Sequence, residues 1–358
     1  MSRKEVIMYK RLSMELTTKC DNALSALRQI DNVIESINNN ELNKNNKLLN
    51  KYAKYLQKTK KSLINKIEHT KQQIQQARTK RNEDYIAQYK RDSIINKTNE
   101  LAKAVSKLTT AEFYVVRQMI NNNLISDEQK PKQETPNLSS LAIAAKQILV
   151  DKIKQIDDFA IRELAFNQLS KNIVPYDEII KNATSEYNTL LNKSSFAQDI
   201  ANKLKFFCVD QEKIDYILSQ ELNINTIEAI NEMVNNVIND VMLKNKTLKA
   251  IIEAIKARGF VVDMQNDFKI DHKTNIAKLI AKKPSGQIAE FEISLNGKLM
   301  YHFDNYQGQT CQNDIKPFLN DLENIYGIDI VNREVIWSNP DEEKQEKKIK
   351  QMIVKRNR

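Results

Sequence analysis

Lysines recur at helical spacing in the most basic part of the chain. They step by three and four residues, which places their side chains along one side of a helix. A row of ammonium groups can neutralise successive phosphates of a nucleic-acid backbone, or it can lie on anionic lipid headgroups or an acidic protein. The plainest interpretation is a solvated helix flank, so the alternatives stay open at this point. The six residues are Lys44, Lys47, Lys51, Lys54, Lys58 and Lys61.

Positive charge is concentrated in the first third of the chain. Residues 1–125 contain 24 Lys and Arg residues against 12 Asp and Glu residues, whereas the formal net charge of the whole chain is +10. From Lys44 to Arg81 there are 12 basic residues and a single acid, Glu68. A field of one sign along one element indicates a partner of opposite charge. Tyr52 and Tyr55 lie among these lysines; helical spacing favours the seam or flank of the helix, and base stacking is the alternative.

The nearest approach to a nucleophilic constellation is Cys311 with His302 and either Asp304 or Asp314. A cysteine nucleophile needs a base within hydrogen-bond reach and a carboxylate that orients the base. Alternation along the strand favours a different interpretation, in which His302 lies on an exposed strand face and Cys311 packs beneath the following helix. We therefore expect Cys311 to be structural.

Other motifs that carry chemistry are missing from the sequence. It contains neither of the glycine-rich phosphate-binding motifs, Gly-x-x-x-x-Gly-Lys-Ser/Thr and Gly-x-Gly-x-x-Gly. Only three histidines and no Cys-x-x-Cys pair are present, so few residues could form a zinc site. Five acids could be taken for a metal-dependent nuclease set, but Glu290-Phe291-Glu292 stands where such nucleases carry Glu-x-Lys. We expect solvated turns and strand faces there, and no catalytic, metal or cofactor site. The five acids are Asp263, Asp267, Asp271, Glu290 and Glu292.

The glycines divide the chain, because all five lie after residue 258. Glycine supplies the positive φ that tight turns need, so a glycine-free stretch indicates a run of helices. The fold class that we expect is mainly α, with a small C-terminal α+β domain that contains a four- or five-stranded antiparallel sheet. The expected domains are a long basic coiled coil or helical hairpin in 1–125, a linker in 126–137, a helical bundle in 138–258, the α+β domain in 259–340 and a charged tail in 341–358.

The first domain contains two helical patterns. Apolar residues recur at helical spacing over 4–37, and a second, very long pattern starts near Leu48 and continues to Asn122 if it is unbroken. Its apolar stripe is too narrow to stabilise a lone helix, so it needs a partner helix. An antiparallel hairpin of 5–38 with 47–80 leaves 81–123 without a partner. We therefore expect a homo- or hetero-oligomer that forms through the N-terminal helices.

After Gly259 the apolar period changes from about 3.6 residues to two, which is typical of strands. Asn296-Gly297 is a strong signal for a tight hairpin. We expect one more helix at 314–326, stopped by Gly327, and a last strand at 328–337. The earlier strands are expected at 260–264, 276–281, 288–295 and 299–303.

Cysteine usage and hydropathy bear on location. Three cysteines that lie far apart and are odd in number argue against a disulfide framework and for a reducing compartment. The first residues lack the apolar core of a signal peptide, and no apolar stretch approaches the ~18 residues of a membrane span. We expect a cytoplasmic protein without a transmembrane segment.

Residues 286–328 combine Asn296-Gly297, the segment Gly308-Gln309-Thr310-Cys311 and a helix that ends at Gly327. This segment resembles a family of short uncharacterised bacterial proteins that are often encoded beside AAA+ ATPases. The resemblance implies a subunit that works beside a separate motor protein. The function that we expect is a non-enzymatic coiled-coil scaffold or adaptor in a bacterial or phage-related assembly, and the alternative is nucleic-acid binding along Lys44–Arg81.

Overall fold

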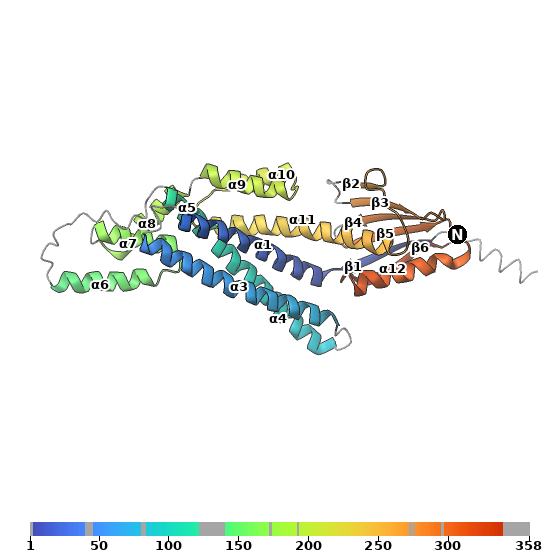
Figure 1. Cartoon of the computed structure of the whole chain (residues 1–358), viewed down its shortest axis with the longest axis horizontal. Coiled ribbons are helices and arrows are strands. Elements are labelled where there is room, and N and C mark those ends of the chain that lie inside the picture. Colours follow the sequence, from blue (N-terminus) through green and yellow to red (C-terminus); the bar gives the residue numbers. More distant parts are fainter. Residues whose placement is uncertain are drawn as a thin grey trace, which may run out of the picture. The chain divides into compact units, whose positions relative to one another are not determined.

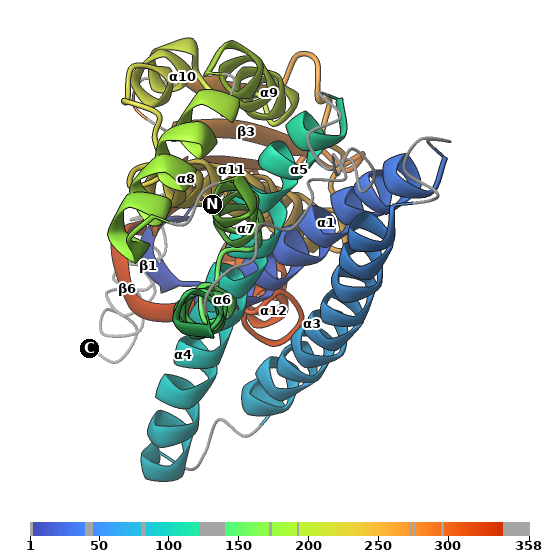
Figure 2. The ribbon, with the colours of Figure 1, turned by 90° about the vertical axis from the view of Figure 1, so that its left-hand side faces the viewer.

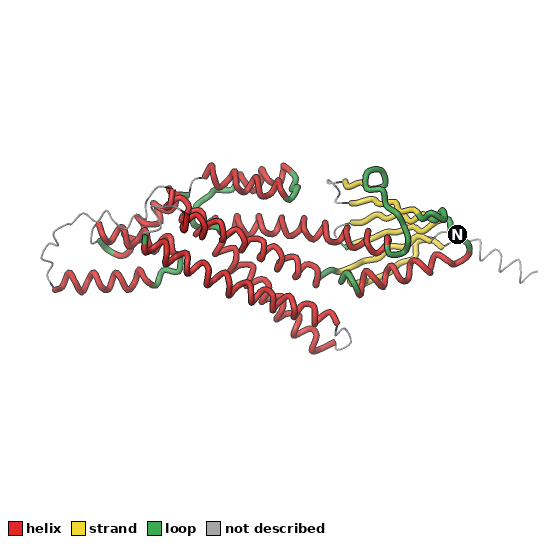
Figure 3. Tube along the Cα trace, in the orientation of Figure 1, coloured by secondary structure: helices red, strands yellow, loops and turns green. Residues whose placement is uncertain are grey.

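The chain folds into two compact units, which we call the helical unit and the sheet unit. In this computed structural model the described residues are 3–39, 46–79, 84–121, 140–171, 174–191, 193–271, 274, 276–294 and 297–338. Lys19–Asn239 make up the helical unit, whereas Met1–Thr18 and Asp240–Arg358 make up the sheet unit. The helical unit therefore takes in most of two ranges that we expected to be separate. All the described strands lie in the sheet unit (Figures 1 and 3).

Ten described helices contribute to the helical unit, and the first and last of them continue into the sheet unit. These helices confirm the mainly α fold that the glycine-free sequence predicted. Their hydrophobic residues stabilise them by packing. The helices are α1 (Leu12–Asn39), α3 (Lys47–Thr79), α4 (Asp84–Thr109), α5 (Ala111–Asn121), α6 (Ser140–Lys154), α7 (Phe159–Lys171), α8 (Tyr176–Leu190), α9 (Lys193–Phe206), α10 (Gln211–Leu218) and α11 (Ile227–Lys256).

Helices α1 and α3 are antiparallel neighbours. Lys60 pairs with Asp31, and Lys71 pairs with Asp21 at 2.7 Å, so residues later in α3 meet residues earlier in α1. The two helices therefore run antiparallel; the hairpin or coiled-coil domain over 1–125 stays a prediction. Thr70 occupies a polar core position, because it is buried and its hydroxyl donates to the carbonyl of Lys66.

The long second pattern is not one helix. It is divided into α3, α4 and α5, and α3 packs against α4 (Figure 2). Lys19 of α1 also donates to Asn99 of α4 over 2.9 Å. The residues after position 81 therefore find packing partners within the chain, which the hairpin of α1 and α3 alone did not provide.

The sheet unit contains a six-stranded antiparallel sheet in the order β2-β3-β4-β5-β1-β6. Apolar residues on one face of the sheet form a core with the C-terminal half of α11 and with α12. The N-terminal strand lies between β5 and β6, so the sheet joins both ends of the sequence. The strands are β1 (Arg3–Lys10), β2 (Phe268–Asp271), β3 (Ile276–Lys282), β4 (Ile288–Ser294), β5 (Lys298–Asp304) and β6 (Asp329–Ser338); η1 (Gly308–Cys311) precedes α12 (Gln312–Asn324).

The prediction of a helix from residue 4 was wrong for β1. Glu5, Ile7 and Tyr9 point into the core, whereas Val6 and Met8 point to the other face. Period two was hidden in the sequence because a charged residue stands on the buried face and apolar residues stand on both faces. This extra strand is one reason why the sheet has six strands instead of four or five.

Two further strand predictions need correction. Residues 260–264 form only an isolated bridge, between Val261 and Lys282, whereas the short strand β2 was not predicted. Strand β6 carries two register shifts against β1, which leave Val331 and Ile336 as extra, exposed residues. Such bulges are common on edge strands, where they disturb a row of unpaired backbone groups.

The hairpin between β4 and β5 was predicted correctly, and Gly297 shows why its turn needs glycine. Its φ is +100°, and a Cβ atom there would lie 2.8 Å from the carbonyl oxygen of Tyr9. The amide of Tyr9 also donates to the Gly297 carbonyl over 2.7 Å. The turn therefore contacts the end of β1 directly, backbone to backbone.

Some predicted features fall outside the described residues. These are the linker at 126–137, the tail at 341–358 and Lys44. Among the helices that are described, none combines the length and the apolar character that crossing a membrane requires.

Candidate nucleic-acid interface

Five of the six predicted lysines lie on α3, and all five are exposed. At about 100° per residue, their directions cluster within one quarter of the helix circumference. The row covers about 21 Å of helix axis, with one ammonium group about every 5 Å. We call this surface the lysine face; it consists of Lys47, Lys51, Lys54, Lys58 and Lys61.

The opposite side of α3 fixes the direction of the lysine face. The buried residues of α3 point about 180° away from the lysines by the same helical geometry. Because this apolar side packs within the helical unit, the lysines must face outward. The buried residues include Leu49, Leu56, Leu63, Ile67 and Ile74.

Tyr52 anchors the first half of α3. Its side chain is 2% exposed, and its ring stacks on Phe159 of α7 with 4.0 Å between centroids. Its hydroxyl donates to Oε2 of Glu112 on α5 over 3.2 Å. Tyr55, one turn later, is 50% exposed. The structure thus separates two tyrosines that the sequence treated alike.

Two carboxyl groups lie together beneath this anchor. Burial and, to a smaller extent, the charge of the neighbouring Asp158 raise the pKa of Glu112 from 4.5 to about 7. Burial also raises the pKa of Asp158, although its hydrogen bonds with the backbone amides of Ile161 and Ala160 oppose the change. Asp158 caps the beginning of α7, since its Oδ1 accepts from the Ile161 amide over 3.0 Å.

Sequence reasoning missed this carboxyl pair. Glu112 and Asp158 are far apart in the chain, and each stands beside apolar residues in an ordinary helical pattern. The only local signal is Asp158 immediately before Phe159, which is a typical helix N-cap. Their proximity depends on the packing of α5 against α7.

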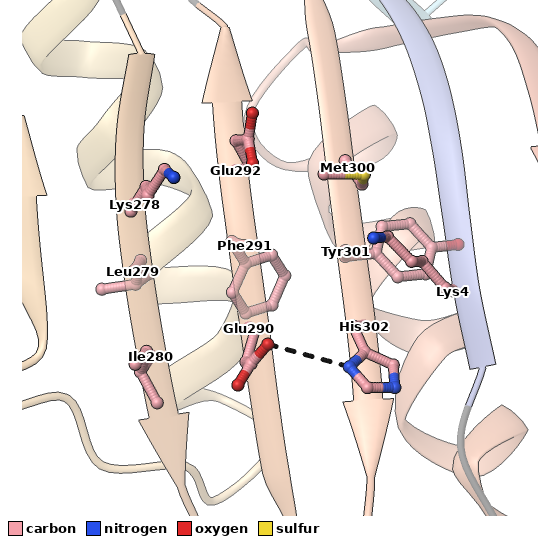
Figure 4. Close-up of a pocket in the computed structure, with 10 residues that line it drawn as sticks. All are labelled: Lys4, Lys278, Leu279, Ile280, Glu290, Phe291, Glu292, Met300, Tyr301 and His302. Carbon is pink, nitrogen blue, oxygen red and sulfur yellow. Dashed lines mark ion pairs between the residues drawn. The ribbon is translucent and has the colours of Figure 1, made fainter. Parts of the chain in front are cut away.

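The structure does not assemble the candidate nucleophile. His302 lies on the face of β5 that points away from α12, and its Nδ1 is 3.7 Å from Oε2 of Glu290 (Figure 4). Cys311 is 4% exposed and belongs to the core on the other face of the sheet. The pKa of the Cys311 thiol is raised, because the effect of burial is larger than the opposite effects of Arg3 and the helix backbone. The arrangement matches the structural interpretation of Cys311.

Asp314, the second acid considered for that site, is held elsewhere. Its Oδ2 accepts from the Tyr306 hydroxyl over 2.6 Å and pairs with Lys283 at 2.7 Å. The Lys283 ammonium also lies 4.8 Å from the centre of the Phe260 ring. These contacts tie α12 to the segments that precede β4 and follow β5.

The same side of the sheet as His302 has a shallow depression of about 260 Å³ (Figure 4). Charges of both signs line it, because Lys278 on β3 and Lys4 on β1 lie on either side of Glu290 and Glu292 on β4. Two of the other acids take part in turn or cross-strand contacts: Asp263 accepts from Asn266, and Asp267 pairs with Lys282 at 3.1 Å. In the described part of the chain, no three Cys, His, Asp or Glu side chains are grouped so as to hold a metal ion.

Comparisons with protein-family models, with curated proteins and with solved structures gave no match to this chain.

Proposed function

We propose that this chain binds nucleic acid, and that the lysine face of α3 holds the sugar-phosphate backbone. The observation that carries the proposal is the row of exposed lysines directly opposite the buried side of the helix. A solvated flank usually carries charges of both signs, whereas Lys44–Arg81 contains 12 basic residues and a single acid. Packing fixes the helix, so the charges form a rail of fixed direction.

The electrostatics favour a linear polyanion. Each phosphate that a lysine neutralises releases condensed counterions, so affinity grows with the number of contacts and falls steeply with salt. The rail has a length of about 21 Å and is straight, which suits a chain of phosphates better than a single anionic group.

The test is a neutralised lysine face. In the variant Lys54→Gln, Lys58→Gln and Lys61→Gln the helix should persist, because Gln and Lys have similar helix propensities. Fluorescence anisotropy with a labelled oligonucleotide should show weaker binding. The slope of log Kd against the logarithm of the salt concentration should decrease by about 2 for a single strand. These three lysines are chosen because Lys51 lies close enough to Glu163 to lower its pKa.

A matched variant controls for the loss of net charge. Lys181→Gln, Lys205→Gln and Lys213→Gln remove three exposed lysines from α8, α9 and α10. This control should bind as the unchanged protein does. Equal affinities for all three proteins contradict the proposal, and binding of anionic vesicles without binding of nucleic acid would replace it with a lipid surface.

The scaffold or adaptor role, with or without an adjacent ATPase, stays a prediction. Its premise was an apolar seam that needs a partner, and the seam of α3 is buried within the helical unit. Light scattering coupled to size-exclusion chromatography tests whether the chain associates with itself. A mass above that of one chain, increasing with concentration, would support self-association, whereas a constant mass of 41.6 kDa would remove it.

A further inference from the structure

Three aromatic rings form two consecutive stacked pairs, Phe159 with Tyr52 and Tyr52 with Tyr55, and this row of contacts leads from buried to exposed residues. Phe159 is 8% exposed, Tyr52 is 2% exposed, and Tyr55 is 50% exposed. Phe159 and Tyr52 have centroids 4.0 Å apart and planes inclined by 17°, and Tyr52 and Tyr55 are 6.0 Å apart and inclined by 20°. The two planes of each pair are therefore nearly parallel, and Tyr55 is the outer, exposed ring.

The inner end of the row is fixed. The Arg162 guanidinium lies 5.5 Å from the centre of the Phe159 ring, and the Tyr52 hydroxyl is bonded to Glu112. Tyr55 thus stacks on a ring that is held by burial and by a hydrogen bond. An aromatic side chain held in this way loses little conformational entropy when another flat ring packs on it.

The outer ring lies at the edge of the lysine face. Tyr55 is four residues after Lys51 and three residues before Lys58, and side chains at these spacings are neighbours on a helix surface. An exposed ring beside a row of ammonium groups is the combination that proteins use to hold unpaired bases together with their backbone. The three-ring row and the lysine face therefore point to one ligand.

We propose that Tyr55 stacks on a base, and that the ligand of the lysine face is a single-stranded nucleic acid. The proposal rests on the proposed function and names its substrate class. A duplex keeps the faces of its bases inside the helix, so it can offer this surface only phosphates. A single strand can offer phosphates to the lysines and a base to Tyr55 at once.

The experiment compares three ligands of equal length, of about 20 nucleotides: a single strand, a duplex, and an abasic deoxyribose-phosphate chain. The unchanged protein should prefer the single strand. Tyr55→Ala should weaken binding of the single strand by about fivefold to a hundredfold, which corresponds to the loss of one stacked base. Binding of the abasic chain should not change, and Tyr55→Phe should bind as the unchanged protein does.

Tyr216 on α10 provides the matched control, because it is exposed to 62% and lies on another helix. Tyr216→Ala should leave all three affinities unchanged. A photo-crosslink between a 5-iodouracil base and Tyr55, mapped by mass spectrometry, gives an independent readout.

The outcomes separate the two proposals. If Tyr55→Ala keeps full affinity for the single strand while the lysine variant loses it, stacking is overturned and the lysine face stands. Stacking is also overturned if the unchanged protein binds the duplex or the abasic chain as tightly as the single strand. If the lysine variant binds as tightly as the unchanged protein, or if no nucleic acid binds at all, the proposed function fails and the stacking proposal fails with it.

Discussion

The hydroxyl of Tyr52 and Oε2 of Glu112 lie 3.2 Å apart, in a hydrogen bond that joins α3 to α5. Tyr52 is buried, and the burial of Glu112 raises its pKa more than the nearby backbone amide of Phe159 lowers it. The helix that carries the lysine face is therefore attached to a carboxyl group that changes its charge near neutral pH. The stability of this attachment should depend on pH.

We expect the free energy of unfolding of the helical unit to fall as the pH rises from 5 to 8. Folded Glu112 has a pKa of about 7, whereas the ordinary value is 4.5, so between these values the folded state holds a proton that the unfolded state has lost. Stability therefore decreases with pH in this window, by roughly 3 kcal/mol. Urea unfolding followed by circular dichroism measures it.

Glu112→Gln is the matched variant, because an amide keeps the shape and the acceptor oxygen without the charge. The decrease between pH 5 and 8 should become smaller, because the carboxyl group that holds the extra proton in the folded state is gone. A variant with the same pH dependence as the unchanged protein would show that Glu112 does not titrate in this window.

In the sheet unit we expect the opposite sign of pH dependence at acid pH. Glu5 is fully buried; burial raises its pKa, but hydrogen bonds from Arg333, Tyr301 and Arg3 outweigh burial and lower it. The stability that Glu5 contributes is present above its ordinary pKa of 4.5 and is lost as the pH falls below it. Hydrogen exchange resolved by peptide distinguishes the two units.

Removing one arginine tests the same group at constant pH. Arg333 donates from Nε and from Nη2 to the two carboxylate oxygens of Glu5, the second contact at 2.9 Å. Arg333→Ala should destabilise the sheet unit by about 3 kcal/mol, because a buried carboxylate loses one of its partners. Glu334→Ala, an exposed neighbour on β6, serves as the control and should change stability by less than about 0.5 kcal/mol.

Two glycines form a natural pair for measuring a steric contact. Gly297 and Gly286 have similar positive φ values, +100° and +93°, but only at Gly297 would a Cβ meet a neighbouring backbone atom. Gly286→Ala should cost about 1 kcal/mol through the conformation alone. Gly297→Ala should reduce stability more than Gly286→Ala does, because its Cβ would also contact the Tyr9 carbonyl. Equal midpoints of the two variants in thermal unfolding would contradict this explanation.

Cysteine labelling checks the structural interpretation of Cys311. Near neutral pH an alkylating reagent should react first with Cys208, which is exposed, and slowly with the buried Cys20 and Cys311. Cys208→Ser should remove the fast phase. Selective labelling of Cys311 would instead indicate an activated thiol and would revive an enzymatic role.

Much of the helical architecture could be predicted from the sequence, and so could the hairpin at Gly297. Helical periodicity and the position of glycine depend on local geometry, so a single sequence carries them. The placement of the lysines on one exposed side of α3 follows from the same periodicity. The buried position of Thr70 fits the same periodicity, because Ile67, three residues earlier, and Ile74, four residues later, are also buried.

Tertiary structure alone decided the rest. The strand β1 owes its place to pairing with β5 and β6, which lie far away in the sequence, and its buried Glu5 is tolerated only because Arg333 comes from a position 328 residues later. The difference between Tyr52 and Tyr55 depends in the same way on where α7 packs. The sequence sets which side of a helix or strand a residue occupies, but only the packing of distant segments decides which of those sides is covered, because burial is a property of the neighbours that a residue meets.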